Sequence, residues 1–311
     1  MNPTMLALFG GVFALLLTAS IIGFILSQRV SSDAGIETVA NLNARIKAWW
    51  LMIAIFAFAF TFGKGVTIIL FALTSFYCLR EFLSITPTRA EDHSATIAAF
   101  YLFIPLQYWL IWIDYLALLM IMIPVWAFLL LPLLAVLKGE TRDFLTRSSR
   151  IQWALMLNVF CISHAPALLL LDIPGFEQNF LLLFFLIAVV QLSDVLQYVF
   201  GKLFGKHKVA PRVSPAKTWE GLIGGGLSAS AIGAGLFWIT PFSPWQAALL
   251  ALTIVFAGFA GGLVLSAVKR SLGAKDWGTM IEGHGGALDR MDSVSFAAPV
   301  FFHLTNYFFV P

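Results

Sequence analysis

The sequence predicts an all-α, polytopic integral membrane protein without a soluble domain. Of its 311 residues, 60% are hydrophobic and only 11% are charged, whereas a soluble domain carries roughly 25% charged residues. The hydrophobic residues form long runs, and a helix of about 20 such residues crosses a bilayer. The polar residues gather in short connections between the runs. The small net charge of +3 gives no indication of nucleic-acid binding.

About ten apolar runs can be distinguished, and each is expected to form one membrane-spanning helix. In chain order they are 5–27, 48–62, 65–82, 95–113, 116–137, 151–171, 178–200, 219–240, 247–268 and 293–310. The second and third runs are short and only Gly63, Lys64 and Gly65 separate them. A single fused helix, and thus nine spans, is the alternative.

The distribution of Lys and Arg favours ten spans. Under this count, 18 of the 19 basic residues belong to the odd-numbered connections, and the even-numbered ones hold only Lys64. Cytoplasmic loops are enriched in basic residues, so these connections are expected in the cytoplasm and both termini outside. We expect an N-terminal region of spans one to six at 1–176 and a C-terminal region of spans seven to ten at 177–311, with cytoplasmic loops 201–218 and 269–292.

The connection before the eighth span, FGKLFGKHKVAPRVSPAKTWEGLIGGG, is basic and rich in glycine. Ser214 followed by Pro215 predicts a helix start, with serine at the N-cap and proline at the first helical position. The free N–H groups of such a helix start, beside Arg212 and Lys217, suit an anion. The alternative is an ordinary basic loop near lipid headgroups.

The connection before the last span, SAVKRSLGAKDWGTMIEGHGGALDRMDS, gathers carboxylates, basic residues and glycines. Asp289 and Asp292 are three residues apart and would share a helix face. Clustered carboxylates beside basic residues suit Mg²⁺ holding a polyphosphate. The alternative is a solvated loop with local ion pairs. Asp194 lies inside the seventh span, where a carboxylate is costly and usually functional.

The two connections resemble the motifs of phosphatidate cytidylyltransferases. The resemblance rests on S-A-V-K-R-x4-K-D-x-G-x3-E-G-H-G-G-x-L-D-R-M-D-S at 266–293 and on Y-V-F-G-K-L-F-G-K-H-K-x-A-P-R-V-S-P-A-K-T-W-E-G at 198–221. It implies transfer of CMP from CTP to phosphatidic acid, at the cytoplasmic face of the inner cell membrane. CTP, phosphatidic acid and the lipid bilayer are the implied partners, and a homodimer is left open.

The resemblance also implies roles for individual residues. The expected metal ligands for Mg²⁺ are Asp194, Asp276, Asp289 and Asp292. The expected catalytic residues are Lys269, Arg270, Lys275, His284, Asp289 and Arg290. The expected substrate-binding residues are Ser214, Lys217, Thr218, Ser266, Gly285 and Gly286.

The sequence departs from the family pattern at three places. Gly262 stands where the family usually has an aspartate that looks like a metal ligand, which weakens the case for a second metal ion. Glu282 replaces a proline, and 194–198 read D-V-L-Q-Y instead of D-S-x-A-Y. The alternatives are a divergent paralogue acting on another lipid phosphate, a CTP-dependent lipid kinase and a transporter. A transporter is disfavoured because the acids crowd one edge and no matching halves are found.

Overall fold

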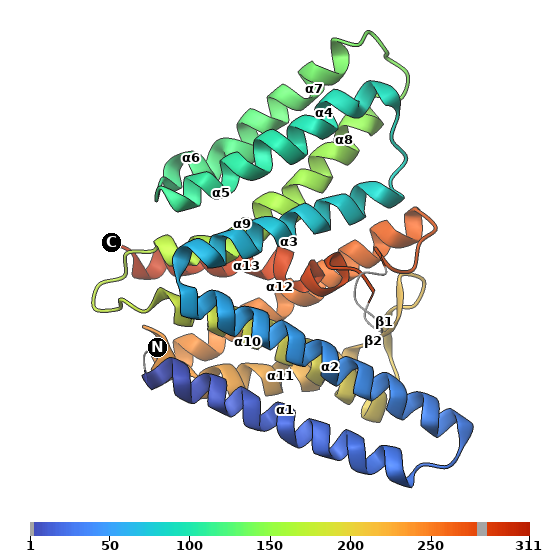
Figure 1. Cartoon of the computed structure of the whole chain (residues 1–311), viewed down its shortest axis with the longest axis vertical. Helices are drawn as coiled ribbons and strands as arrows, with labels where there is room; N and C mark the ends of the chain where they lie inside the picture. Colours follow the sequence, from blue (N-terminus) through green and yellow to red (C-terminus); the bar gives the residue numbers. More distant parts are fainter. Residues whose placement is uncertain (1–2, 279–284) are drawn as a thin grey trace.

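The computed structural model describes residues 3–278 and 285–311, which form long helices running back and forth (Figure 1). The first three are α1 (Pro3–Arg29), α2 (Asp33–Phe62) and α3 (Lys64–Ile85). Three further segments join two helices through a π-helical stretch: α4 (His93–Ala98) with α5 (Ile104–Trp112), α6 (Leu116–Ile121) with α7 (Phe128–Val136), and α8 (Phe144–Leu155) with α9 (Ile162–Ala167). The last four are α10 (Asn179–Phe204), α11 (Trp219–Gly235), α12 (Pro244–Ser271) and α13 (Leu288–Phe309).

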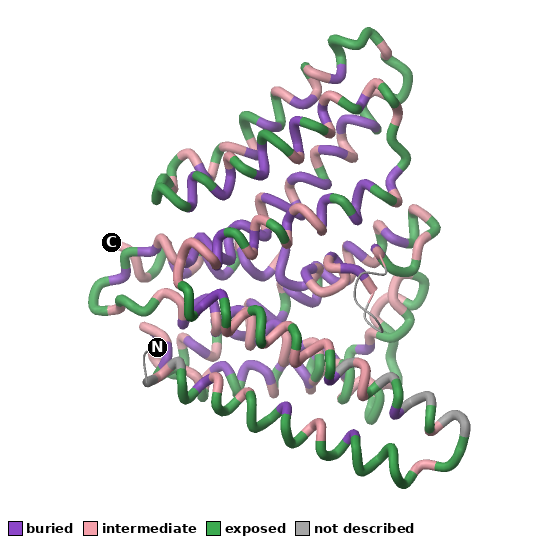
Figure 2. The backbone as a smooth tube through the Cα atoms, in the orientation of Figure 1, coloured by how far each residue is buried: buried purple, intermediate pink, exposed green. Residues whose placement is uncertain are grey.

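The predicted membrane protein is confirmed. Within the described residues, eight helical segments are long and apolar enough to cross a membrane. The other two predicted spans also form helices. α11 is short at 17 residues, and α13 begins with a polar turn. α11 packs against α10 and α12, while α13 packs against α12 and α9. Large apolar side chains on α1, such as Leu6 and Phe24, are exposed, as expected of a helix that faces lipid (Figure 2).

The second and third spans are separate helices rather than one fused helix. Gly63 ends α2 and precedes α3 with φ at 87°, in the left-handed region that glycine adopts readily. The chain reverses there, and α2 and α3 pack against each other (Figure 1). Lys64 is the one basic residue of the even-numbered connections. It forms an ion pair with Asp114, which lies in the connection between α5 and α6.

The odd-numbered connections all lie at the right-hand end of the molecule in Figure 1, opposite the two termini. Ion pairs join two of these connections. Arg89 Nη2 lies 2.7 Å from Asp143 Oδ2, and Arg147 Nε lies 2.9 Å from Asp92 Oδ1. The Arg147–Asp92 pair is buried, with side chains only 2% and 3% exposed. The side on which the sequence concentrates its basic residues is therefore one face of the structure.

The predicted helix start at Ser214 is wrong. Residues Ser214–Thr218 form strand β2, which pairs antiparallel with β1 (Lys208–Ala210), and α11 begins only at Trp219. The N-cap is Thr218, whose Oγ1 accepts a hydrogen bond of 3.1 Å from Gly221 N. Pairing with β1 satisfies the backbone of this segment in an extended form, so the helix starts where the hairpin ends.

A single hydrophobic core runs through both halves of the chain. It includes Phe71 and Leu79 of α3, Phe185 of α10 and Phe301 and Phe302 of α13, all of them fully buried. Helices from the N-terminal spans, α3 and α9, therefore pack directly against α13.

Candidate active site

The candidate site lies at the basic end of the molecule, where α10, β2, α12 and α13 meet. α12 packs against α13, and both contact α10. α10 and α11 approach closely because glycines face Gln197: a Cβ at Gly225 would lie 2.4 Å from Gln197 N, and one at Gly221 would lie 2.7 Å from Gln197 O. This packing places the end of β2, with Lys217, beside the inner part of α10, with Asp194.

Asp194 and Asp292 are joined through one serine. Ser293 Oγ donates to Asp194 Oδ1 at 3.3 Å, and Ser293 N donates to Asp292 Oδ1 at 2.7 Å. Both carboxylates come from helices and both are half-buried. Within the described residues, the second oxygen of each accepts no hydrogen bond, so two carboxylate oxygens remain for a ligand. This pair brings together two of the four predicted metal ligands.

Lys217 supplies the positive charge beside this pair. Its Nζ donates to the Phe259 carbonyl oxygen at 3.2 Å and lies 4.5 Å from the centre of the Phe259 ring. Burial lowers the pKa of Lys217, while the carboxylates of Asp194 and Asp292 oppose that effect. Because β2 ends here, the lysine enters the site from the loop side and not from a membrane helix.

Asp289 is held by the protein on both of its oxygens. Oδ1 accepts from Lys269 Nζ at 2.6 Å, and Oδ2 accepts from the backbone N–H groups of Trp277 and Gly286, each at 2.9 Å. The two side chains of the ion pair are only 11% and 7% exposed. Gly285 has φ at 80°, and a Cβ there would lie 2.6 Å from Asp289 Oδ2. Asp289 and Lys269 thus tie Trp277 and Gly286 to the first turn of α13.

Glu81 is a residue that sequence reasoning missed. It lies near the end of α3 and is buried. Its carboxylate accepts from Ala287 N and Leu288 N, both at 2.9 Å, at the start of α13. A Cβ at Gly286 would lie 2.2 Å from Glu81 Oε2, so glycine allows this approach. An acid at the end of an apolar run was the available signal, but the sequence does not show its partner.

The remaining predicted residues occupy different surroundings. Arg270 is exposed, and its guanidinium donates to the carbonyls of Val213 and Ala274, each at 3.3 Å, which ties α12 to the hairpin. Ser266 Oγ donates back to Gly262 O at 2.6 Å. Lys275 and Asp276 are exposed in the connection after α12. Arg290 lies in the first turn of α13, and its charge acts on Asp194. His284, like Glu282, falls outside the described residues.

Asp194 and Asp292 are the residues of this site that could hold one divalent cation. Among residues 3–278 and 285–311, no three His, Cys, Asp or Glu side chains converge as a ready metal site. Mg²⁺, however, is commonly bound by one or two carboxylates and completed by substrate phosphates and water. Asp194 and Asp292, with one open oxygen each, are a donor set of that kind, while Asp289 is occupied by Lys269 and backbone N–H groups.

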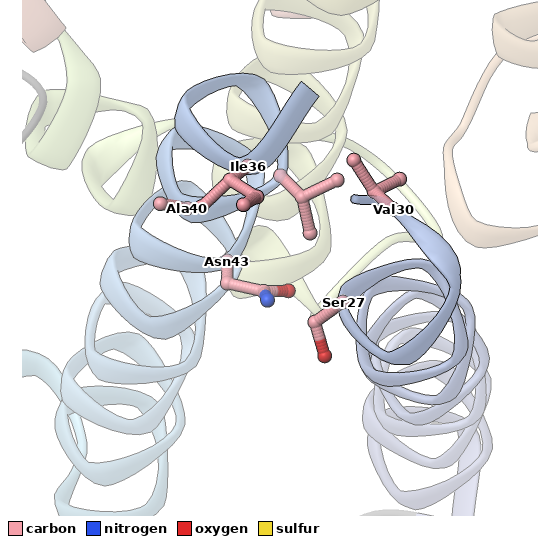
Figure 3. Close-up of a pocket in the computed structure, with 6 residues that line it drawn as sticks. Ser27, Val30, Ile36, Ala40 and Asn43 are labelled. Carbon is pink, nitrogen blue, oxygen red and sulfur yellow. The ribbon is translucent and has the colours of Figure 1, made fainter. Parts of the chain in front are cut away.

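A separate pocket of about 220 Å³ lies between the ends of α1 and α2 (Figure 3). Its lining is mostly apolar, with Ser27 and Asn43 as the polar side chains. None of the predicted site residues lines it.

Comparison with known proteins assigns the class. The family model described as "Cytidylyltransferase family" matches residues 43–308, and the chain belongs to this family of nucleotidyltransferases. It is 38% identical to the uncharacterized protein YnbB of Escherichia coli (strain K12) over 299 residues, which cover 95% of this chain and 96% of YnbB.

Two relatives carry a named activity. The phosphatidate cytidylyltransferase of Mycobacterium leprae is 45% identical over 114 residues, 36% of each chain. That of Brucella abortus is 41% identical over 127 residues, 40% of this chain and 46% of the relative. The chain thus aligns with less than half the length of these two enzymes.

Proposed function

We propose that this protein is a phosphatidate cytidylyltransferase, which transfers CMP from CTP to phosphatidic acid and releases pyrophosphate. The observation that carries the proposal is the pair Asp194–Asp292 joined by Ser293, with Lys217 beside it, at the basic end of a membrane bundle. A lipid phosphate at the membrane surface and a soluble triphosphate can both reach such a position. The partial relatives with this activity support the same reaction.

The reaction needs alignment and charge neutralisation more than proton transfer. A phosphate oxygen of phosphatidic acid attacks the α-phosphorus of CTP, and the bond from that phosphorus to the bridging oxygen breaks. Pyrophosphate leaves with the electron pair, and a new phosphoanhydride is formed. The nucleophile is already anionic, so no strong base is required. Catalysis then depends on holding the two anions in line and on cationic groups at the developing charge.

Different residues would bind the phosphates, hold the metal ion and position the site. Lys217 would donate to phosphate oxygens, with Arg290 and the exposed Arg270 and Lys275 as further cationic groups around the triphosphate. Asp194 and Asp292 would hold Mg²⁺, which when bound neutralises charge on the triphosphate. Lys269 and Asp289 hold Trp277 and Gly286 beside the first turn of α13. We further propose the inner cell membrane as the location, with the site facing the cytoplasm, because the basic connections share this end.

A CTP-dependent lipid kinase is the competing function, and the position of the label distinguishes the two. Protein purified in detergent is incubated with phosphatidic acid and CTP labelled at either the α- or the γ-phosphate. Cytidylyl transfer moves only the α-label into lipid, whereas a kinase moves only the γ-label. Asp292→Asn is the inactive control. Transfer of the γ-label alone would overturn the proposal. α-Label entering another lipid phosphate but not phosphatidic acid would identify a divergent paralogue.

A further inference from the structure

Gly262 faces the same space as Asp292 and Lys217. A Cβ at this position would lie 2.5 Å from Lys217 Nζ and 3.8 Å from Asp292 Oδ2. The first distance is far below normal contact, so the ammonium occupies the volume that any side chain at 262 would need. Glycine in the middle of a helix is unfavourable. Here it allows the lysine to reach between α12 and α13.

Lys217 is anchored on one side and open on the other. It donates one hydrogen bond, to the Phe259 carbonyl, and its charge lies over the Phe259 ring. Within the described part of the chain it makes no further hydrogen bond, so two of its three N–H donors remain for a ligand. Both Asp194 and Asp292 act on it electrostatically, yet neither forms an ion pair with it among the described residues.

We propose that the Lys217 ammonium takes the place of a second divalent cation, and that Gly262 is the residue that makes room for it. The inference rests on the proposed function for the identity of the ligand, a nucleoside triphosphate accompanied by one Mg²⁺. The site then contains one metal position, at Asp194 and Asp292, and one built-in positive charge. We expect the two open N–H donors of Lys217 to bind oxygens of the departing pyrophosphate. Lys217 keeps its proton throughout.

Removing the Lys217 ammonium and adding a carboxylate at position 262 tests whether the lysine stands in place of a divalent cation. Lys217→Met should lower turnover about 100-fold, the loss typical of removing one donor to the transition state. The double variant Lys217→Met, Gly262→Asp should bind one more Mn²⁺ per chain than the wild-type protein, counted by electron paramagnetic resonance with Mn²⁺ alone. Equal Mn²⁺ counts in a stably folded double variant, or full turnover of Lys217→Met, would overturn the proposal. Lys206→Met removes an exposed lysine of the same connection and is the control for charge.

Gly262→Ala tests the position without adding a charge. The new Cβ must displace Lys217 Nζ, so turnover should fall about tenfold while the Mn²⁺ count and the melting temperature stay near the wild-type values. Gly258→Ala, one turn earlier on α12, is the matched control, because its Cβ would meet Ser293 at an ordinary 3.4 Å. Wild-type turnover of Gly262→Ala would overturn the proposal. If the wild-type protein transfers no CMP, the proposed function fails, but the comparison of Mn²⁺ counts still decides the role of Lys217.

Discussion

The carboxylate of Glu81 holds the backbone N–H of Leu288 at 2.9 Å, across 207 positions of the sequence. The same carboxylate accepts from Ala287 N. A negative charge at the start of a helix is favourable, because the first N–H groups have no partner within the helix. The N-terminal spans therefore determine where α13, which carries Asp289 and Asp292, begins.

Removing this cap should destabilise the protein and weaken the site together. Glu81→Ala leaves the buried N–H of Leu288 and the part-buried N–H of Ala287 without this acceptor, and an unsatisfied buried N–H costs ~1–3 kcal/mol. We expect a lower melting temperature in detergent and a large loss of turnover, with Glu81→Gln intermediate because its amide retains one acceptor oxygen. Glu91→Ala, which removes a half-buried acid outside the cap, is the control. An unchanged melting temperature of Glu81→Ala would show that α13 does not depend on this contact.

The Lys269–Asp289 pair should behave as a unit. Breaking a buried ion pair by changing one partner costs about 3–5 kcal/mol, whereas removing both charges is often much less harmful. Asp289→Asn should therefore lower the melting temperature and nearly abolish turnover. The double variant Lys269→Met, Asp289→Asn should recover stability but not turnover. Thermal unfolding of the four proteins in the double-mutant cycle measures this, and strictly additive losses would contradict the coupling.

The close packing of α10 against α11 depends on Gly225. A Cβ there would lie 2.4 Å from Gln197 N and 2.6 Å from Gln197 Cα, both backbone atoms that cannot move aside alone. Gly225→Ala should destabilise the protein by ~1–3 kcal/mol, the range for overpacking, and should reduce turnover by displacing Asp194. Gly235→Ala in the same helix meets nothing within 4 Å and is the matched control. Equal unfolding curves for the two variants would argue against this packing.

The two ends of the bundle should be accessible from opposite sides of the membrane. Lys206, which follows α10, and Pro244, which begins α12, are both exposed. The connection after α10 and the start of α12 lie at opposite ends of the helices (Figure 1). A cysteine at Lys206 should react with an impermeant maleimide only in inverted vesicles, and one at Pro244 only in right-side-out vesicles. The parent protein is the blank, because Cys78 is buried and Cys161 half-buried. Labelling of both positions from one side would reject the predicted topology.

The membrane class and the positions of the helices follow from local properties of the sequence. Apolar runs and the placement of basic residues depend only on how each segment partitions between lipid and water. The helix ends are less local: α2 begins at Asp33, well before the apolar run at 48, because a helix continues into water as long as its backbone bonds and packing persist. The ten predicted runs all correspond to helical segments, and Gly63 separates the second from the third.

The site itself was determined only in part by the sequence. The sequence indicated Asp194 because a carboxylate inside a membrane span is costly without a function. It indicated Asp292 and Lys217 through their places in the two motif-bearing connections. The start of α11 was decided by the β1–β2 pairing, in which residues 214–218 exchange hydrogen bonds with a neighbouring strand and Thr218 becomes the cap. A local cap preference could not anticipate that competition.

Only the tertiary structure decided which charges meet. Asp289 joins Lys269, and Glu81 joins the start of α13. The ammonium of Lys217 fills the space left by Gly262. These partners lie on different helices, and their distances depend on how α3, α10, α12 and α13 cross. Helix crossing is set by the packing of many side chains at once. Composition and motif spacing describe one segment at a time, so they do not determine how the helices cross.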